Sequence, residues 1–281
     1  MSEEEVIRRT SAPITIGSLC GDLARLGVVP GMVVLVHSSL SSMGWVAGGA
    51  VSVVVALEEV LRSFGTLVMP THSTNLSDPS GWVNPPVPEE WWEEIRASMP
   101  AFDPELTPTR NMGAVPECFR NQTNVLRSLH PQLSFAAWGE KSIQILSDHS
   151  LDFGLGEKSP LARIYDLDGW VLLLGVGHGS NTSLHLAECR AHYPGRREIP
   201  CSSPVTIEGH RRWKSFTELN YNASDFEEIG RHFADHHKQA VRRGRVGLAQ
   251  AELFPQRLCI DYAGGWMERH RRWPEYGRVE Q

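Results

Sequence analysis

Three short stretches of uninterrupted apolar residues are the clearest feature of the chain. They are residues 32–36 (MVVLV), 66–69 (TLVM) and 170–176 (WVLLLGV). Runs of this length without alternation are typical of strands that are buried on both faces of a sheet. Residues 50–63, between the first two runs, have helical spacing. The pattern therefore predicts a strand–helix–strand unit with a right-handed crossover.

Further segments with apolar residues at helical spacing predict helices around these strands. They cover residues 19–27, 115–121, 141–146, 225–242 and 255–272, and one more helix begins near Asn181. Residues 200–213 are compatible with an antiparallel hairpin, so the division into parallel and antiparallel strands stays open. Strands alternate with helices and no repeat or linker interrupts them. We therefore expect one α/β domain over residues 1–281, with a central mixed sheet flanked by helices.

Periodicity is lost between residues 76 and 110. Seven of the 18 prolines fall in this stretch, together with Trp82, Trp91 and Trp92. A loop this long inside a compact domain is either functional or disordered. Its tryptophans favour an ordered, functional loop.

Composition and charge exclude several classes of protein. The chain is 41% apolar and 21% charged, as soluble globular proteins are, and no apolar run reaches the ~20 residues that span a bilayer. Residues 1–10 are charged and the five cysteines lack CxxC spacing, which predicts a reduced, cytoplasmic protein. A net charge of −6 disfavours nucleic acid and suits a cationic small molecule. The oligomeric state stays open.

Hydroxyl-rich residues follow the first predicted strand. Residues 37–42 (HSSLSS) lead towards Gly48 and Gly49, which open the next helix. Hydroxyls, exposed amides and a helix N-terminus at the carboxyl end of a strand suit a phosphate or pyrophosphate. The segment is neither a Walker loop nor a GxGxxG turn. A polar loop capped by serine accounts for it equally well.

A glycine turn, residues 175–179 (GVGHG), follows the third strand, and the next helix carries His185 and Glu188. Residues three apart share one helix face. A carboxylate beside an imidazole fixes its tautomer and raises its basicity, as a general base requires. A surface salt bridge or a partly buried structural histidine would have the same spacing.

Two other patterns have competing interpretations. Residues 88–94 (PEEWWEE) combine carboxylates and indoles, which could bind a polycationic sugar, but a solvated helix start has the same composition. His232 and His236 are four apart and could ligate zinc, but no third ligand stands out, so no metal is predicted. The absence of a GxSxG elbow disfavours a typical α/β-hydrolase.

Several sequence blocks occur in the order found in one known family. They are residues 26–31 (LGVVPG), 36–40 (VHSSL), 65–71 (GTLVMPT), 107–113 (TPTRNMG), 127–131 (RSLHP) and 172–188 (LLLGVGHGSNTSLHLAE). Over residues 16–272 the chain resembles the aminoglycoside 3-N-acetyltransferases, and within them the Bacillus-type members. This resemblance implies an antibiotic acetyltransferase-like fold, which is unrelated to the Gcn5-like fold.

The same resemblance implies acetyl-CoA-dependent acetylation of the 3-amino group of 2-deoxystreptamine aminoglycosides, and hence antibiotic resistance. It implies His185 as the catalytic base, Glu188 as its orienting partner and Asp225 as a third acidic residue. Direct transfer is expected, because Cys189 faces a different side of the helix from His185. The residues expected to hold the cofactor are His37, Ser38, Ser39, Leu40, Ser41, Ser42, Met112, Gly113, Val115 and Thr182.

The polycationic aminoglycoside is assigned to the loop at residues 76–110. The residues expected to bind it are Asp78, Glu89, Trp91, Trp92 and Glu93. Two other functions stay open: acetylation of a different amine, and a non-catalytic protein that binds a cationic ligand or CoA. The presence of both His185 and Glu188 argues against the second, since binding alone would not need them.

Overall fold

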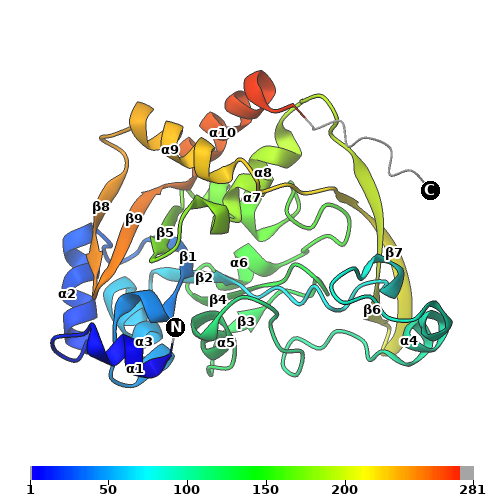
Figure 1. The fold of residues 1–281 in the computed structure, drawn as a ribbon, viewed down its shortest axis with the longest axis horizontal. Helices are drawn as coiled ribbons and strands as arrows, with labels where there is room; N and C mark the ends of the chain where they lie inside the picture. The colour runs from blue at the N-terminus through cyan, green and yellow to red at the C-terminus, as the bar shows by residue number, and fades with distance from the viewer. Residues whose placement is uncertain (1, 273–281) are drawn as a thin grey trace.

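Residues 2–272 of the protein are described by a computed structural model, drawn as a ribbon in Figure 1. Its central feature is a seven-stranded sheet in the order β3-β4-β2-β1-β5-β9-β8. The strands are β1 (Val33–Ser38), β2 (Thr66–Pro70), β3 (Leu126–Arg127), β4 (Phe135–Gly139), β5 (Trp170–Leu174), β8 (Arg242–Val246) and β9 (Ala249–Pro255). Because parallel and antiparallel pairs coexist, the predicted mixed sheet is confirmed.

The three strands predicted from apolar runs form the parallel centre of the sheet. Strand β1 pairs in parallel with β2 on one side and with β5 on the other, and the outer pairs are antiparallel. Within β1, Leu35 packs into one hydrophobic cluster, whereas Val34 and Val36 pack into another on the opposite face. Both faces are therefore buried, which explains the uninterrupted apolar pattern.

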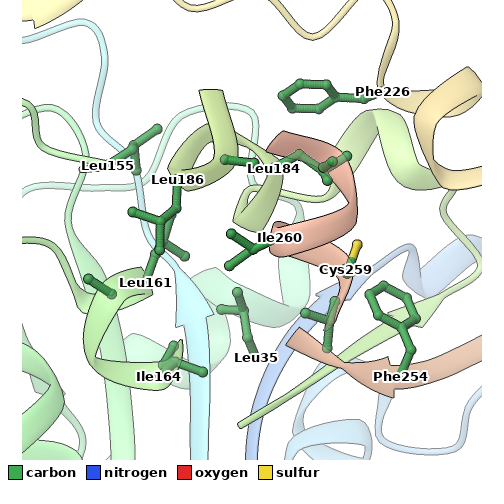
Figure 2. Close-up of a cluster of buried hydrophobic side chains, with 14 of the residues drawn as sticks. Leu35, Leu155, Leu161, Ile164, Leu184, Leu186, Phe226, Phe254, Cys259 and Ile260 are labelled. Carbon is green, nitrogen blue, oxygen red and sulfur yellow. The ribbon is translucent and has the colours of Figure 1, made fainter. Parts of the chain in front are cut away.

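Helices cover both faces of the sheet. Figure 2 shows part of the cluster on the face of Leu35, where Leu161, Leu184 and Ile260 meet. The helices on this face are α6 (Ser142–Leu146), α7 (Pro160–Asp166), α8 (Ser183–Arg190), α9 (Phe226–His236) and α10 (Gln256–His270). Those on the other face are α2 (Ile16–Leu26), α3 (Gly49–Leu61) and α5 (Ala114–Arg120), and α1 (Glu3–Arg8) precedes them in the chain.

A separate antiparallel hairpin stands apart from the central sheet. It consists of β6 (Glu198–Ile207) and β7 (His210–Leu219), and Figure 1 shows it on the far side of the molecule from α2 and β8. The loop at residues 76–110 packs against it and contains the short helix α4 (Trp92–Ser98). Arg211 Nε donates to the carbonyl of Met99 at 2.6 Å, and the Phe102 amide donates to the carbonyl of Pro204 at 3.0 Å. The loop is therefore ordered, as predicted.

The outer parts of the sheet differ from the prediction. Helix α9 ends at His236, short of the predicted end at residue 242, and β8 and β9 follow where the sequence predicted no strand. Strand β8 is an edge strand whose sequence, RRGRV, is mostly polar, so it lacks an apolar signal. Strands β3 and β4 and helices α1 and α7 are also additional to the prediction. Among residues 2–272, no helix combines the length and apolar character that a membrane span requires.

Candidate active site

A cavity of about 650 Å³ lies at the carboxyl ends of β1, β2 and β5. Its walls come from residues 36–41 at the end of β1 and beyond, residues 111–114 at the start of α5, and residues 179–182 before α8, with His72 and His185. Open α/β sheets place their ligands at this edge. The structure thus brings together three segments that lie far apart in the sequence.

Most residues predicted to hold the cofactor line this cavity. They are His37, Ser38, Ser39, Leu40, Ser41, Met112, Gly113 and Thr182. Ser42 and Val115 are not in the wall. The Ser42 hydroxyl donates to the carbonyl of Gly175 at 3.1 Å, and the Val115 side chain is buried in the hydrophobic cluster beneath α5. Both side chains support the walls.

The glycine turn after β5 is explained by close packing against α9. The Gly179 amide donates to Glu227 Oε1 at 2.7 Å, and a Cβ atom at Gly177 would lie 2.3 Å from the same oxygen. A side chain at residue 177 would therefore displace the Glu227 carboxylate from this position. Glu227 thereby anchors the turn that leads into α8.

His185 and Glu188 form a close pair on α8. His185 Nδ1 lies 2.8 Å from Glu188 Oε2. Since a carboxylate only accepts hydrogen bonds, Nδ1 carries the proton and Nε2 is left as the basic nitrogen. The imidazole ring also contacts the rings of Tyr221 and Phe226, at centroid distances of 4.9 and 4.8 Å. The ring is thus held in one orientation with the right tautomer for a base.

Glu188 is completely buried and its other oxygen is fully engaged. Oε1 accepts hydrogen bonds from the Asn222 amide at 2.9 Å and from Arg271 Nη1 at 2.6 Å. Arg271 in turn donates from Nε to Asp225 Oδ2 at 2.7 Å. Asp225, the predicted third acidic residue, therefore reaches the histidine pair through an arginine.

Two further histidines in the cavity wall are neutral. Burial lowers the pKa of His37 and of His72 to about 3. Nε2 of each ring and the hydroxyl of Ser38 are buried and have no hydrogen-bond partner among residues 2–272. Buried polar atoms without partners are rare. These three atoms lie beside the cavity and could hydrogen-bond a ligand there.

Comparison with known proteins identifies the family. The profile of the aminoglycoside 3-N-acetyltransferases matches residues 35–268. The chain belongs to this family. The Bacillus subtilis (strain 168) protein named SPbeta prophage-derived aminoglycoside N(3')-acetyltransferase-like protein YokD is 47% identical over 264 residues, which are 94% of this chain and 96% of that protein. The crystal structure of YokD superposes with a TM-score of 0.92 and covers 94% of this chain and 97% of that one, at 46% identity.

Two other solved structures of the family carry ligands. The structure described as AAC-IIIb binary with CoASH has a TM-score of 0.82 and 29% identity, and the match covers 94% of this chain and 100% of that one. The structure described as AAC-VIa bound to sisomicin has a TM-score of 0.83 and 30% identity, and the match covers 93% and 100%. The predicted antibiotic acetyltransferase-like fold is confirmed, and this chain is an acyltransferase by family.

In this member of the acetyltransferase family, the residues predicted to bind the aminoglycoside lie outside the wall of the His185 cavity. Asp78 accepts hydrogen bonds from Arg96, which hold its pKa down at about 2, and Glu93 also pairs with Arg96. Trp92 lies under the same guanidinium, 5.8 Å from the ring centroid. Glu89 and Trp91 are exposed in the turn that begins α4, so the solvated helix start is present. Their role with substrate stays a prediction.

Cys189 follows Glu188 on α8, and its thiol is largely buried. Burial raises the pKa of its thiol to about 12, and its sulfur lies 3.7 Å from the Tyr221 hydroxyl. A thiol needs a lowered pKa to attack an acyl group. Cys189 is also absent from the cavity wall.

Sequence reasoning missed His72 and Arg271. His72 lies two residues beyond β2, and the preceding block at residues 65–71 was recognised without its histidine. Arg271 lies just beyond α10, in a basic stretch that carried no motif. In the part of the chain that the structure describes, no group of three or more His, Cys, Asp or Glu is arranged to hold a metal ion.

Proposed function

We propose that the protein transfers the acetyl group of acetyl-CoA to the 3-amino group of a 2-deoxystreptamine aminoglycoside, and that this reaction gives antibiotic resistance. The observation that carries the proposal is the His185–Glu188 pair, with 2.8 Å between Nδ1 and Oε2, in the wall of a 650 Å³ cavity. An oriented imidazole with a free Nε2 is the arrangement that general-base catalysis requires. Membership of the acetyltransferase family supports the choice of reaction.

The cavity fits acetyl-CoA as the second substrate. Ser38, His37 and His72 offer unpaired polar atoms, and the hydroxyls and amides of residues 38–41 can receive phosphate or pantetheine oxygens. The similar AAC-IIIb structure is described with CoASH, which supports the assignment. Acetyl-CoA, when bound, supplies a thioester whose C–S bond breaks as the C–N bond of the product amide forms.

His185 moves the proton in this reaction. An ammonium group cannot attack a thioester, so the amine must lose a proton before or during attack. Nε2 of His185 takes that proton, Glu188 stabilises the resulting imidazolium, and the proton then passes to the departing sulfur. Donors in the cavity wall would stabilise the negative charge on the carbonyl oxygen. Because the Cys189 thiol has a raised pKa, no acetyl-enzyme is invoked.

A different amine is the second candidate acceptor. The similar AAC-VIa structure is described with sisomicin, which favours an aminoglycoside. However, Asp78 and Glu93, assigned to bind the polycation, both pair with Arg96 instead. A smaller or less cationic amine would need fewer carboxylates.

The test is release of CoA thiol, followed with a disulfide chromophore, against a panel of aminoglycosides with and without a free 3-amino group. We expect saturable release only with the free 3-amine. Release with another amine alone would establish the second candidate. Binding of CoA by calorimetry without any release would contradict both and leave a binding protein.

A further inference from the structure

Arg271 is a buried cation in contact with Glu188, the partner of His185, and it lies beyond the segment matched by the family profile. Its side chain is 3% exposed, and residues 35–268 define the family match. The guanidinium contacts the rings of Tyr193 and Phe226, at 5.0 and 5.9 Å from their centroids. Burial alone would lower the pKa of Arg271, but the carboxylates of Asp225 and Glu188 outweigh it and raise this pKa.

The hydrogen bonds of Arg271 join two carboxylates that come from different elements. Nη1 donates to Glu188 on α8 at 2.6 Å, Nε donates to Asp225 at the start of α9 at 2.7 Å, and Nη2 donates to the Asn222 carbonyl at 2.9 Å. Nη2 also donates to the second oxygen of Asp225. A bidentate contact of this kind fixes the guanidinium plane. Within the described chain, no hydrogen bond or ion pair joins Asp225 directly to His185.

The cluster of Glu188, Asp225, Arg271 and His185 carries one surplus negative charge before His185 is protonated. Glu188 and Asp225 carry two negative charges, Arg271 carries one positive charge, and His185 is neutral before it takes a proton. The surplus of one negative charge is cancelled when His185 becomes an imidazolium. Without Arg271, two carboxylates would hold the imidazolium, and the base would release its proton only at higher pH.

We propose that Arg271 is a positioning residue that sets the pH at which His185 becomes a free base. The proposal rests on the proposed role of His185 as the general base. It assigns Arg271 two tasks: it holds Glu188 so that Oε2 meets Nδ1 of His185, and it cancels the charge of Asp225.

The tyrosine, cysteine and histidine side chains around the cluster are neutral at the pH values of ordinary assays. Burial raises the pKa of Tyr193 and of Cys189 to about 12 and raises that of Tyr221 further. Burial lowers the pKa of His37 and His72 to about 3. Glu218, hydrogen-bonded to Tyr221, and Arg196, hydrogen-bonded to the carbonyl of Cys189, are further charges close by. Between about pH 5 and pH 9, these groups do not change their charge, so they do not disturb the measurement of the His185 titration.

The experiment is an NMR titration of the His185 ring in the substrate-free protein, assigned by loss of its signal in His185→Gln. We expect Arg271→Met to raise the titration midpoint by about one pH unit and Asp225→Asn to lower it by about as much, as expected for one nearby charge. The double variant Arg271→Met/Asp225→Asn keeps the net charge of the cluster and should titrate close to wild type. Arg271→Lys, which keeps the charge, should do the same.

Matched kinetics follow with the amine acceptor identified by the thiol-release panel. The acidic limb of the pH profile of kcat/KM should move with the midpoint, upward in Arg271→Met and downward in Asp225→Asn. The exposed residue Arg269, two positions away, provides the control. Arg269→Met should leave both the midpoint and the pH profile unchanged.

Two results would overturn the proposal. One is a shift of the single variants in the same direction; the other is a double variant that shifts as far as either single variant. A purely structural Arg271 would reduce the amount of active protein and leave the midpoint in place. Because the titration uses no substrate, it can support or refute the role of Arg271 whether or not the thiol-release panel finds an aminoglycoside acceptor.

Discussion

Two arginines in this molecule each bridge two carboxylates, and their surroundings differ. Arg271 joins Glu188 and Asp225, and the exposed fractions of the three side chains are 3%, 0% and 18%. Arg96 joins Asp78 and Glu93, with exposed fractions of 28%, 24% and 90%. The first group contacts His185, whereas the second holds the loop at residues 76–110 near its short helix.

The comparison shows that the energetic contribution of one arginine and two carboxylates depends on how far they are buried. Water screens the Arg96 group, so its attraction contributes little and its loss is tolerated. The Arg271 group has exchanged water for fixed partners, so each charge depends on the others. Removal of one charge from the Arg271 group should therefore change the protonation or position of its other members, and this group is the one at the candidate site.

The largest effect is expected at the histidine beside the buried group. His185→Asn should lower kcat by about 10²–10⁴-fold, because the amine loses its general base. Thiol release from acetyl-CoA measures it, with far-UV circular dichroism as a check on folding. The exposed His192, just after α8, is the control, and His192→Asn should keep wild-type turnover. Unchanged turnover in folded His185→Asn would remove this residue from the mechanism.

The two arginines themselves give the next contrast, in stability. Arg271→Met should lower the free energy of unfolding by about 3–5 kcal/mol, because it leaves the buried carboxylate of Glu188 and the partly buried one of Asp225 without their cation. Arg96→Met should lower it far less, because water screens this exposed group. Urea denaturation of both variants tests this. Equal losses of unfolding free energy in the two variants would show that burial does not distinguish the Arg271 group from the Arg96 group.

Buried histidines without partners extend the comparison to pH. His37 and His72 have a pKa of about 3 in the folded protein against 6.5 as an ordinary value. Between these values the unfolded chain binds protons that the folded protein does not, so stability is full above pH 6.5 and falls as the pH drops towards 3. Each histidine should contribute a slope of about 1.4 kcal/mol per pH unit.

His72→Gln should therefore lose less stability than wild type between neutral and acidic pH, and the difference should equal the contribution of one histidine. Urea denaturation at a series of pH values measures the slope. Replacement of the exposed His192 by Gln should leave it as in wild type. If His72→Gln also leaves the slope unchanged, His72 is not held neutral by the fold.

The smallest effect is expected at Cys189, next to Glu188 in sequence. Because burial raises the pKa of its thiol to about 12, Cys189→Ala should keep kcat close to that of wild type. Steady-state thiol release is the measurement. A thousandfold loss would instead point to an acetyl-cysteine intermediate.

The prediction of the fold succeeded where the signal was local and strong. Strands β1, β2 and β5 are buried on both faces, so their apolar runs are uninterrupted. Strand β8 lies at the edge with polar residues, and β3 has only two residues, so neither carries a pattern of its own. These strands exist because the backbone of a neighbouring strand offers hydrogen bonds, and such partners are distant in sequence.

The candidate site divides in the same way. His185 and Glu188 could be paired from the sequence alone, because a spacing of three in a helix places both side chains on one face. Resemblance to the acetyltransferase family then selected the segment at residues 37–42 and gave these residues a role. Asp225 could be named, but its contact with Arg271 could not.

By itself, the sequence determined the buried strands at the centre of the sheet, the shared face of His185 and Glu188, and membership of a known acetyltransferase family. Tertiary structure alone decided that Arg271, 83 residues after Glu188, completes the cluster, and that His72 joins His37 in the cavity wall. The physical reason is the distance along the chain over which each effect acts. Periodicity and spacing act over a few residues of backbone, whereas the burial and balance of charges depend on every element packed around them.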